Sequence, residues 1–115
     1  MRVLIMAKEG EQNEVATTPT PHAIAEYQKF NEELVKAGVV LEAGRLYPSS
    51  QSKRVRFDGE KRTVIDGPFA ETKELVAGYW LWQVRSIDEA LEWLTRAPYE
   101  GGTFEVREVV EYEGM

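Results

Sequence analysis

The stretch Val76-Ala-Gly-Tyr-Trp-Leu-Trp-Gln-Val84 is the most aromatic part of this 115-residue chain, and its pattern decides the fold. Successive side chains of a strand point to opposite faces of the sheet. Both faces of this strand are largely apolar: one carries Val76, Trp80, Trp82 and Val84, and the other carries Ala77, Tyr79 and Leu81. A strand of this kind is expected at the centre of a sheet that is covered on both sides.

A strand and a helix are predicted at the start of the chain. The continuous apolar run Val3–Ala7 predicts a second buried strand. Thr20 is a suitable N-cap, and Pro21 would occupy the first helical position, where its missing N–H has no cost. The apolar residues that follow recur at spacings of three and four, as in an amphipathic helix: Ala23, Tyr27, Phe30, Leu34 and Ala37.

A second helix is predicted to begin after Ser86. The sequence Ser86-Ile-Asp-Glu89 is a capping box, in which the Glu89 side chain reaches back to the N–H of the cap residue. Its buried stripe would consist of Ile87, Ala90, Leu91 and Leu94. Pro98 marks its end.

Four further strand patterns complete the element order. They are Val39–Ala43, Arg54–Phe57, Glu60–Ile65 and Phe104–Tyr112. Asp58-Gly59 between the second and third of these is a strong hairpin signal. The order strand–helix–strand, hairpin, strand–helix–strand predicts an α+β fold, namely a ferredoxin-like βαββαβ sandwich with an extra β-hairpin, in one domain that spans residues 1–115.

The predicted sheet has one face without a cover. Two helices can cover only one face of a four-stranded sheet, yet the strand Val76–Val84 is apolar on both faces. The simplest cover is a second copy of the chain, related by a two-fold axis. We therefore expect a homodimer.

Composition excludes several classes of function. The 14 basic and 20 acidic side chains give a net charge of −6, which disfavours binding to nucleic acid or to an anionic membrane. No cysteine is present, which removes disulfides, thiolate nucleophiles and cysteine-bound zinc. No segment has the roughly 18 apolar residues that span a bilayer, and the first apolar run is too short for a signal peptide. We expect a cytoplasmic protein.

The charge is unevenly distributed along the chain. Residues 1–57 sum to +1 and residues 58–115 sum to −7. A basic stretch runs against the overall sign and consists of Lys53, Arg54, Arg56, Lys61 and Arg62. The simplest interpretation is a solvated face of the predicted hairpin.

The most specific local motif is Asp66-Gly-Pro-Phe-Ala-Glu-Thr-Lys-Glu74. Asp-Gly-Pro predicts a turn, across which the Asp66 carboxylate can accept backbone N–H bonds. Alternatively, Asp66 lies beside Phe69, Tyr79 and Trp80. Partial desolvation would then raise its pKa into a range useful for proton transfer. Both interpretations fit the residues.

This nine-residue segment, followed by Gly78-Tyr-Trp80, resembles the signature of DGPF-domain proteins within the YCII-related family. The resemblance covers nearly the whole chain and includes Asn31–Gly38, Gly44–Pro48 and Ile87–Trp93. It implies a dimeric α+β barrel. Some members resemble partners encoded beside extracytoplasmic-function sigma factors. Some YCII-like relatives are thought to be small-molecule enzymes that use a His–Asp pair.

The chain offers few other groups for chemistry. His22 is the single histidine, and the helix N-terminus would keep it neutral and suitable as a base, a position similar to that of the histidine in YCII-like proteins. Arg45 and Lys73 could hold an anionic group of a substrate or form surface ion pairs. Phe69 and Tyr79 could position the same substrate. The chain has neither a glycine-rich phosphate loop nor a His or Cys cluster, so we expect no cofactor and no metal.

Two functional hypotheses follow. In the first, the protein is a cofactor-free small-molecule enzyme, in which Asp66, alone or with His22, transfers a proton. In the second, it is a non-catalytic dimer that binds a metabolite or regulates a protein, and the family resemblance implies transcription control linked to sigma factors as one such role.

Overall fold

The computed structural model describes residues 1–8, 20–69, 76–99 and 101–111. In chain order they form β1 (Arg2–Lys8), α1 (Pro21–Lys36), β2 (Val40–Arg45), the short 3-10 helix η1 (Ser49–Gln51), β3 (Lys53–Asp58), β4 (Lys61–Asp66), β5 (Val76–Gln83), α2 (Ile87–Leu94) and β6 (Phe104–Glu108). The expected mixture of α and β elements is confirmed. The last strand is shorter than predicted, because its ladder with β1 ends at Glu108.

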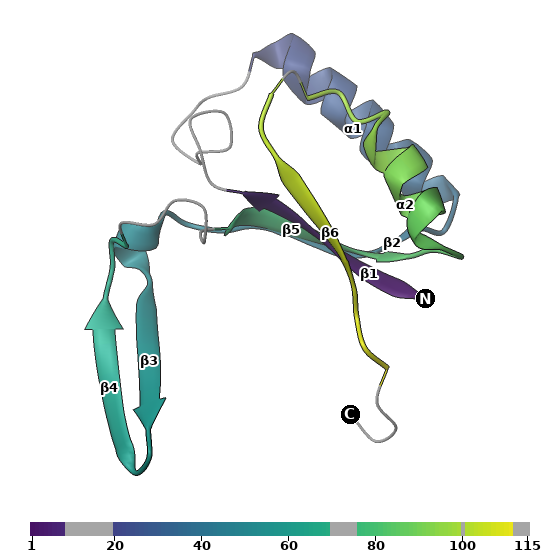
Figure 1. Ribbon diagram of the computed structural model, residues 1–115. Coiled ribbons are helices and arrows are strands. Elements are labelled where there is room, and N and C mark those ends of the chain that lie inside the picture. The colour runs from purple at the N-terminus through teal and green to yellow at the C-terminus, as the bar shows by residue number, and fades with distance from the viewer. Residues whose placement is uncertain (9–19, 70–75, 100, 112–115) are drawn as a thin grey trace.

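The main sheet has four strands in the order β2-β5-β1-β6, and each neighbouring pair is antiparallel. The aromatic strand β5 lies inside this sheet, between β1 and β2. Over the described ranges the sheet is open, with β2 at one edge and β6 at the other. Both helices lie on the same side of it (Figure 1).

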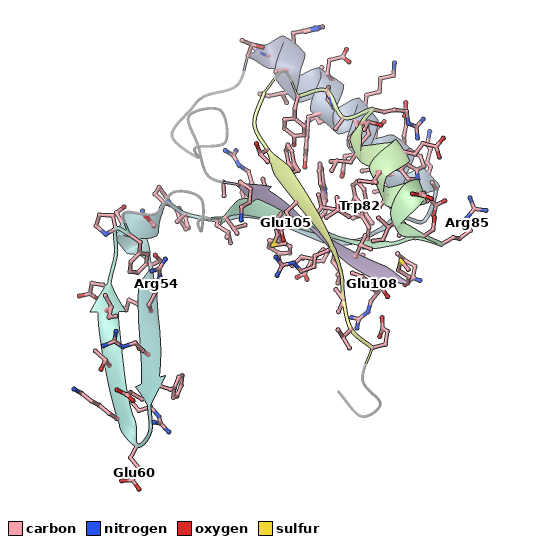
Figure 2. The ribbon with its side chains drawn as sticks, in the orientation of Figure 1. Arg54, Glu60, Trp82, Arg85, Glu105 and Glu108 are labelled. Atoms are coloured by element: carbon pink, nitrogen blue, oxygen red, sulfur yellow. The ribbon has the colours of Figure 1, made fainter. Side chains whose placement is uncertain are left out.

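The hydrophobic core fills the space between the sheet and the helices. Ile5 pairs with Trp80 and Val3 pairs with Trp82, so these four side chains point to one face of the sheet. Trp82 is fully buried there, and Figure 2 shows it between the sheet and the helices. The core members are Val3, Ile5, Phe30, Leu34, Val39, Trp80, Trp82, Val84 and Ala90.

The opposite face of the sheet, here called the open face, has no helix over it in the described part of the chain (Figure 1). Leu4 pairs with Leu81 and Met6 pairs with Tyr79, which places these four side chains together on that face. All four are only partly buried. The predicted apolar character of both faces of β5 is therefore confirmed, and one of them is left uncovered by the described residues.

Both helices begin at the predicted caps. The Thr20 hydroxyl accepts a hydrogen bond from the Ala23 N–H at 3.1 Å, and the Ser86 hydroxyl accepts one from the Glu89 N–H at 3.1 Å. The Glu89 carboxylate, however, accepts from the N–H of Arg85 at 2.8 Å instead of from the predicted cap N–H. The guanidinium of Arg85 also binds this carboxylate and draws it one residue further back.

One member of the predicted stripe of α2 is not buried. Ala90 is fully buried, whereas Leu91 is 44% exposed. The helix has only eight residues, so the sheet covers a narrower part of its surface than the periodicity suggests. Neither helix in the described ranges has the length and hydropathy that a membrane span requires.

The predicted hairpin is present as a separate two-stranded sheet, β3 with β4. Asp58 pairs with Lys61 across a tight turn, in which Gly59 adopts a positive φ of 62°. The hairpin projects away from the main sheet, on the side opposite the helices (Figure 1).

Candidate functional site

The Asp-Gly-Pro motif forms the base of the hairpin, where β4 ends. The Gly67 N–H donates a hydrogen bond to the Ser52 carbonyl at 2.8 Å, and the Gly67–Pro68 peptide is cis. A Cβ atom at residue 67 would lie 1.8 Å from the backbone oxygen of Ser49. The glycine is therefore required because two backbone segments approach each other closely.

Asp66 itself lies in a solvated environment. Its side chain is 74% exposed and forms an ion pair with the Lys53 ammonium at 2.5 Å. The predicted desolvation by Phe69, Tyr79 and Trp80 does not occur within the described chain, because the hairpin carries this carboxylate outward from the sheet. Among the described residues, the ion pair with Lys53 takes the place of the backbone bonds expected across the turn.

Phe69 and Lys73 belong to the same motif. The Phe69 ring is half-buried, and the guanidinium of Arg54 lies 3.8 Å from its centroid. The ring thus supports the hairpin base through a cation–π contact. Lys73 lies outside the described residues.

Tyr79 and Arg45 are on opposite faces of the main sheet. Tyr79 points to the open face, where its ring covers Gly44; a Cβ atom at residue 44 would lie 2.8 Å from its Cε1. Arg45 pairs with Gly78 and therefore points to the helix-covered face. The two residues predicted to bind one substrate therefore lie on opposite faces of the sheet within one protomer, and their joint role stays a prediction.

His22 is the second residue of α1 and is exposed. Among the residues that the structure describes, no hydrogen bond or ion pair joins it to Asp66. The first turn of α1 and the base of the hairpin belong to separate parts of the fold (Figure 1). One chain therefore does not bring the predicted pair together.

On the helix-covered face, three aromatic side chains that the sequence analysis assigned to packing or left out gather together, and Arg45 lies near enough for its charge to act on two of them, Tyr27 and Tyr99. We call Tyr27, Arg45, Trp80 and Tyr99 the aromatic–arginine cluster. The Tyr27 ring stacks on Trp80 with centroids 6.0 Å apart. Tyr99 meets both rings edge-on, at 6.3 Å from Tyr27 and 6.5 Å from Trp80.

The electrostatics of this cluster favour neutral phenols beside a permanent cation. Burial raises the pKa of Tyr27 and of Tyr99, and the positive charge of Arg45 offsets part of this rise in both. The hydroxyls stay protonated at neutral pH and are available as donors.

The indole N–H of Trp80 is a further donor in the cluster. It lies near the Tyr27 phenol and lowers the pKa of that group. This nitrogen is buried and unpaired among the described residues. A buried donor without a partner is costly, so it marks a place where an acceptor would be stabilised.

The cluster is suited to binding an anion. It combines one guanidinium with neutral N–H and O–H donors, and among the described residues no carboxylate contributes to the pKa shift of either phenol. No three metal-ligating side chains gather closely enough to hold an ion within the described ranges.

One signal in the sequence could have revealed this cluster. Tyr27 was assigned to the apolar stripe of α1, although a phenol in such a stripe brings a hydroxyl that has to be satisfied. Tyr99 follows the end of α2, where periodicity gives no information. The register of β2 with β5 places Arg45 on the helix-covered face, and the packing of the helices on that face brings Tyr27 and Tyr99 within range of its charge.

Comparison with known proteins places the chain in a family. The model of the YCII-related domain matches residues 1–113. A protein of Rhizobium meliloti (strain 1021) is 38% identical over 82 residues, which cover 69% of this chain and 66% of the relative, just under two-thirds of its length. That relative is named only as an uncharacterised protein.

Proposed function

The chain belongs to the YCII-related family, and we propose that it is a homodimeric domain that binds a small organic anion at the aromatic–arginine cluster. The observation that carries this proposal is the packing of the Tyr27, Trp80 and Tyr99 rings against one another, with the Arg45 charge acting on both phenols and with an unpaired, buried N–H on Trp80. Charge-assisted bonds from arginine hold carboxylates and phosphates, and the flanking rings suit a planar ligand body.

The dimer in this proposal is of the ferredoxin-like, DGPF type. Two open faces would pack against each other and form a two-sheet barrel, with the helices outside. The strand order β2-β5-β1-β6 supports this arrangement, as do the partly buried side chains of Leu4, Met6 and Leu81. Burial of such apolar surface stabilises the pair of subunits by about 25 cal/mol per Å².

We favour anion binding over proton transfer as the activity of the aromatic–arginine cluster. Neutral phenols with raised pKa values donate hydrogen bonds and do not act as bases at neutral pH. The carboxylate predicted to be a base, Asp66, lies on the hairpin and is ion-paired with Lys53. Its role in proton transfer stays a prediction.

Calorimetric titration with benzoate and with its neutral counterpart benzamide tests the proposal. We expect benzoate to bind, and benzamide to bind at least about tenfold more weakly, because only the anion engages Arg45. Arg45→Gln should weaken benzoate binding by a similar factor. Arg96→Gln is the matched control, since Arg96 is also an exposed arginine next to an aromatic ring, that of Trp93.

Two results would contradict the proposal. One is equal affinity for benzoate and benzamide. The other is benzoate binding that Arg45→Gln and Arg96→Gln change to the same extent. Tyr99→Phe adds a second readout, because it removes one donor and leaves the charge in place; we expect a loss of severalfold in benzoate affinity.

A further inference from the structure

The β3–β4 hairpin buries very little of its surface against the rest of its own chain. Every residue of the two strands except Thr63 is exposed. The exposed side chains include four large apolar ones, namely Val55 at 53%, Phe57 at 69% and Val64 at 63%, and Ile65, opposite Arg54, at 38%. A two-stranded hairpin alone in water is only marginally stable, so this hairpin requires a surface that the described part of one chain does not supply.

The register sorts the side chains of the hairpin into two different faces. Val55 lies opposite Val64, and Phe57 lies opposite Arg62, whose guanidinium is 4.6 Å from the Phe57 ring. Directly opposed residues share a face. We call Val55, Phe57 and Val64 the apolar hairpin face. The other face carries Arg56 opposite Thr63.

Charge and position both indicate which surface covers the apolar hairpin face. Residues 53–66 hold five basic and three acidic side chains, a net charge of +2, which leaves −8 for the rest of a chain whose total is −6. A second copy therefore offers an oppositely charged body to the hairpin. The hairpin also extends on the same side of the sheet as the open face (Figure 1), with Arg54 near its base and Glu60 at its tip (Figure 2).

We propose that the β3–β4 hairpin is an arm that packs its apolar face against the second copy of the chain, the copy that covers the open face. This inference rests on the homodimer proposed above and adds a second contact to it. DNA is a poorer occupant, because the chain as a whole is acidic and because Val55, Phe57 and Val64 need an apolar cover.

Sedimentation equilibrium of paired variants tests the arm. Val55→Thr/Val64→Thr keeps two β-branched residues of similar volume but places hydroxyls in the proposed contact. Because each dimer contains two arms, we expect the dissociation constant of the dimer to rise at least about tenfold. Arg56→Gln/Thr63→Ser changes the neighbouring cross-strand pair on the other face and should leave that constant unchanged within about twofold.

A fluorescent label provides an independent readout in this cysteine-free chain. Acrylodan attached to the cysteine of Val64→Cys should emit at a shorter wavelength in the dimer, where the label is buried. Its emission should shift to a longer wavelength when dilution dissociates the dimer. The same label on the adjacent Thr63→Cys should not shift, since it faces the other way.

The outcomes separate the arm from the dimer itself. A wild-type chain that sediments as a monomer at micromolar concentration contradicts both proposals. If the wild type is a dimer and Val55→Thr/Val64→Thr leaves its dissociation constant unchanged, the arm proposal alone is overturned. The same holds if acrylodan on Val64→Cys stays exposed to solvent in the dimer. Retention on a DNA duplex that is lost with Arg54→Gln/Arg56→Gln would assign the hairpin to nucleic acid and overturn the proposal as well.

Discussion

At the scale of single residues, Gly67 and Gly44 show how the same missing methyl group serves two different purposes. A Cβ atom at residue 67 would collide with the backbone oxygen of Ser49, at 1.8 Å. A Cβ atom at residue 44 would meet only the ring of Tyr79, at 2.8 Å. A ring can move aside by rotation about its side-chain bonds, but two backbone segments have to separate.

We expect Gly67→Ala to destabilise the protein more than Gly44→Ala. The backbone clash at Gly67 should lower the free energy of unfolding by about 2–4 kcal/mol, because the hydrogen bond to Ser52 is lost as the chain shifts. Gly44→Ala should lower it by about 1 kcal/mol. Urea denaturation of both variants measures these values, and equal losses would contradict the explanation.

Asp66→Asn should change stability very little. The ion pair with Lys53 is exposed on both sides, and pairs of this kind contribute less than about 1 kcal/mol. Thermal denaturation at neutral pH measures the effect, with Asp58→Asn, elsewhere on the same hairpin, as the control. A large loss for Asp66→Asn alone would show that the carboxylate holds the turn, as one sequence interpretation suggests.

The sequence predicted the residues of the candidate site only as far as local chemistry extends. The Asp66–Pro68 turn follows from the residues themselves. The solvation of Asp66 does not, because it depends on the direction in which the hairpin leaves the sheet. Likewise Arg45 is a plausible anion ligand from its type alone, but its neighbours Tyr27 and Tyr99 come from distant segments that only the sheet brings together.

At the scale of elements, the first turn of α2 carries a carboxylate with three roles. Glu89 accepts the backbone N–H of Arg85, forms an ion pair with the Arg85 guanidinium at 2.9 Å and lies in the first turn of the helix. The backbone N–H of Arg85, its side chain and its charge all lower the pKa of Glu89 from its ordinary value of 4.5. The helix N-terminus favours the same charge.

Glu89→Gln should therefore remove a pH-dependent part of the stability. Since the folded state lowers the pKa of Glu89, its carboxylate stabilises the fold above pH 4.5, and this contribution is lost as the pH falls through the lowered value. We expect the variant to be about 0.5–1 kcal/mol less stable than the wild type at pH 7. The difference should vanish in stronger acid.

Chemical denaturation at a series of pH values between neutral and strongly acidic tests this expectation. Glu92→Gln, on an exposed position of the same helix, is the control and should give no pH-dependent difference from the wild type. A gap for Glu89→Gln that stays constant across the range would show that packing, not charge, is responsible.

The elements themselves were predictable because their signals are local. Apolar periodicity and capping residues located α1 and α2, and Asp58-Gly59 located the hairpin. The hydrogen bond between Glu89 and Arg85 and the exposure of Leu91 were not predictable, because both depend on how α2 lies on the sheet. The direction of the hairpin was also beyond prediction, since the alternation within its strands does not specify the angle at which the hairpin leaves the main sheet.

At the scale of the whole molecule, β5 explains why the described chain has an apolar surface on each face of its main sheet. Its Trp80 and Trp82 are buried under the helices. Tyr79 and Leu81, which alternate with them along the strand, point to the opposite face and are only half-buried. The alternation that completes one core therefore leaves a second apolar surface. The sequence predicted this surface because strand alternation is a property of the backbone, independent of tertiary context.

Leu81→Glu should separate the proposed dimer. Leu81 pairs with Leu4 on the open face, so a carboxylate there would be buried against its symmetry-related copy and would have to be desolvated. We expect the dissociation constant to rise by at least about 100-fold, which corresponds to a loss of roughly 3 kcal/mol.

Val35→Glu, at an exposed apolar position of α1, introduces the same charge away from the open face and should leave the dimer intact. Sedimentation equilibrium measures both variants, and circular dichroism confirms that the monomer of Leu81→Glu is folded. If both variants sediment like the wild type, the open face is covered by something other than a second copy, because two unpaired carboxylates buried in an apolar interface carry a large desolvation penalty.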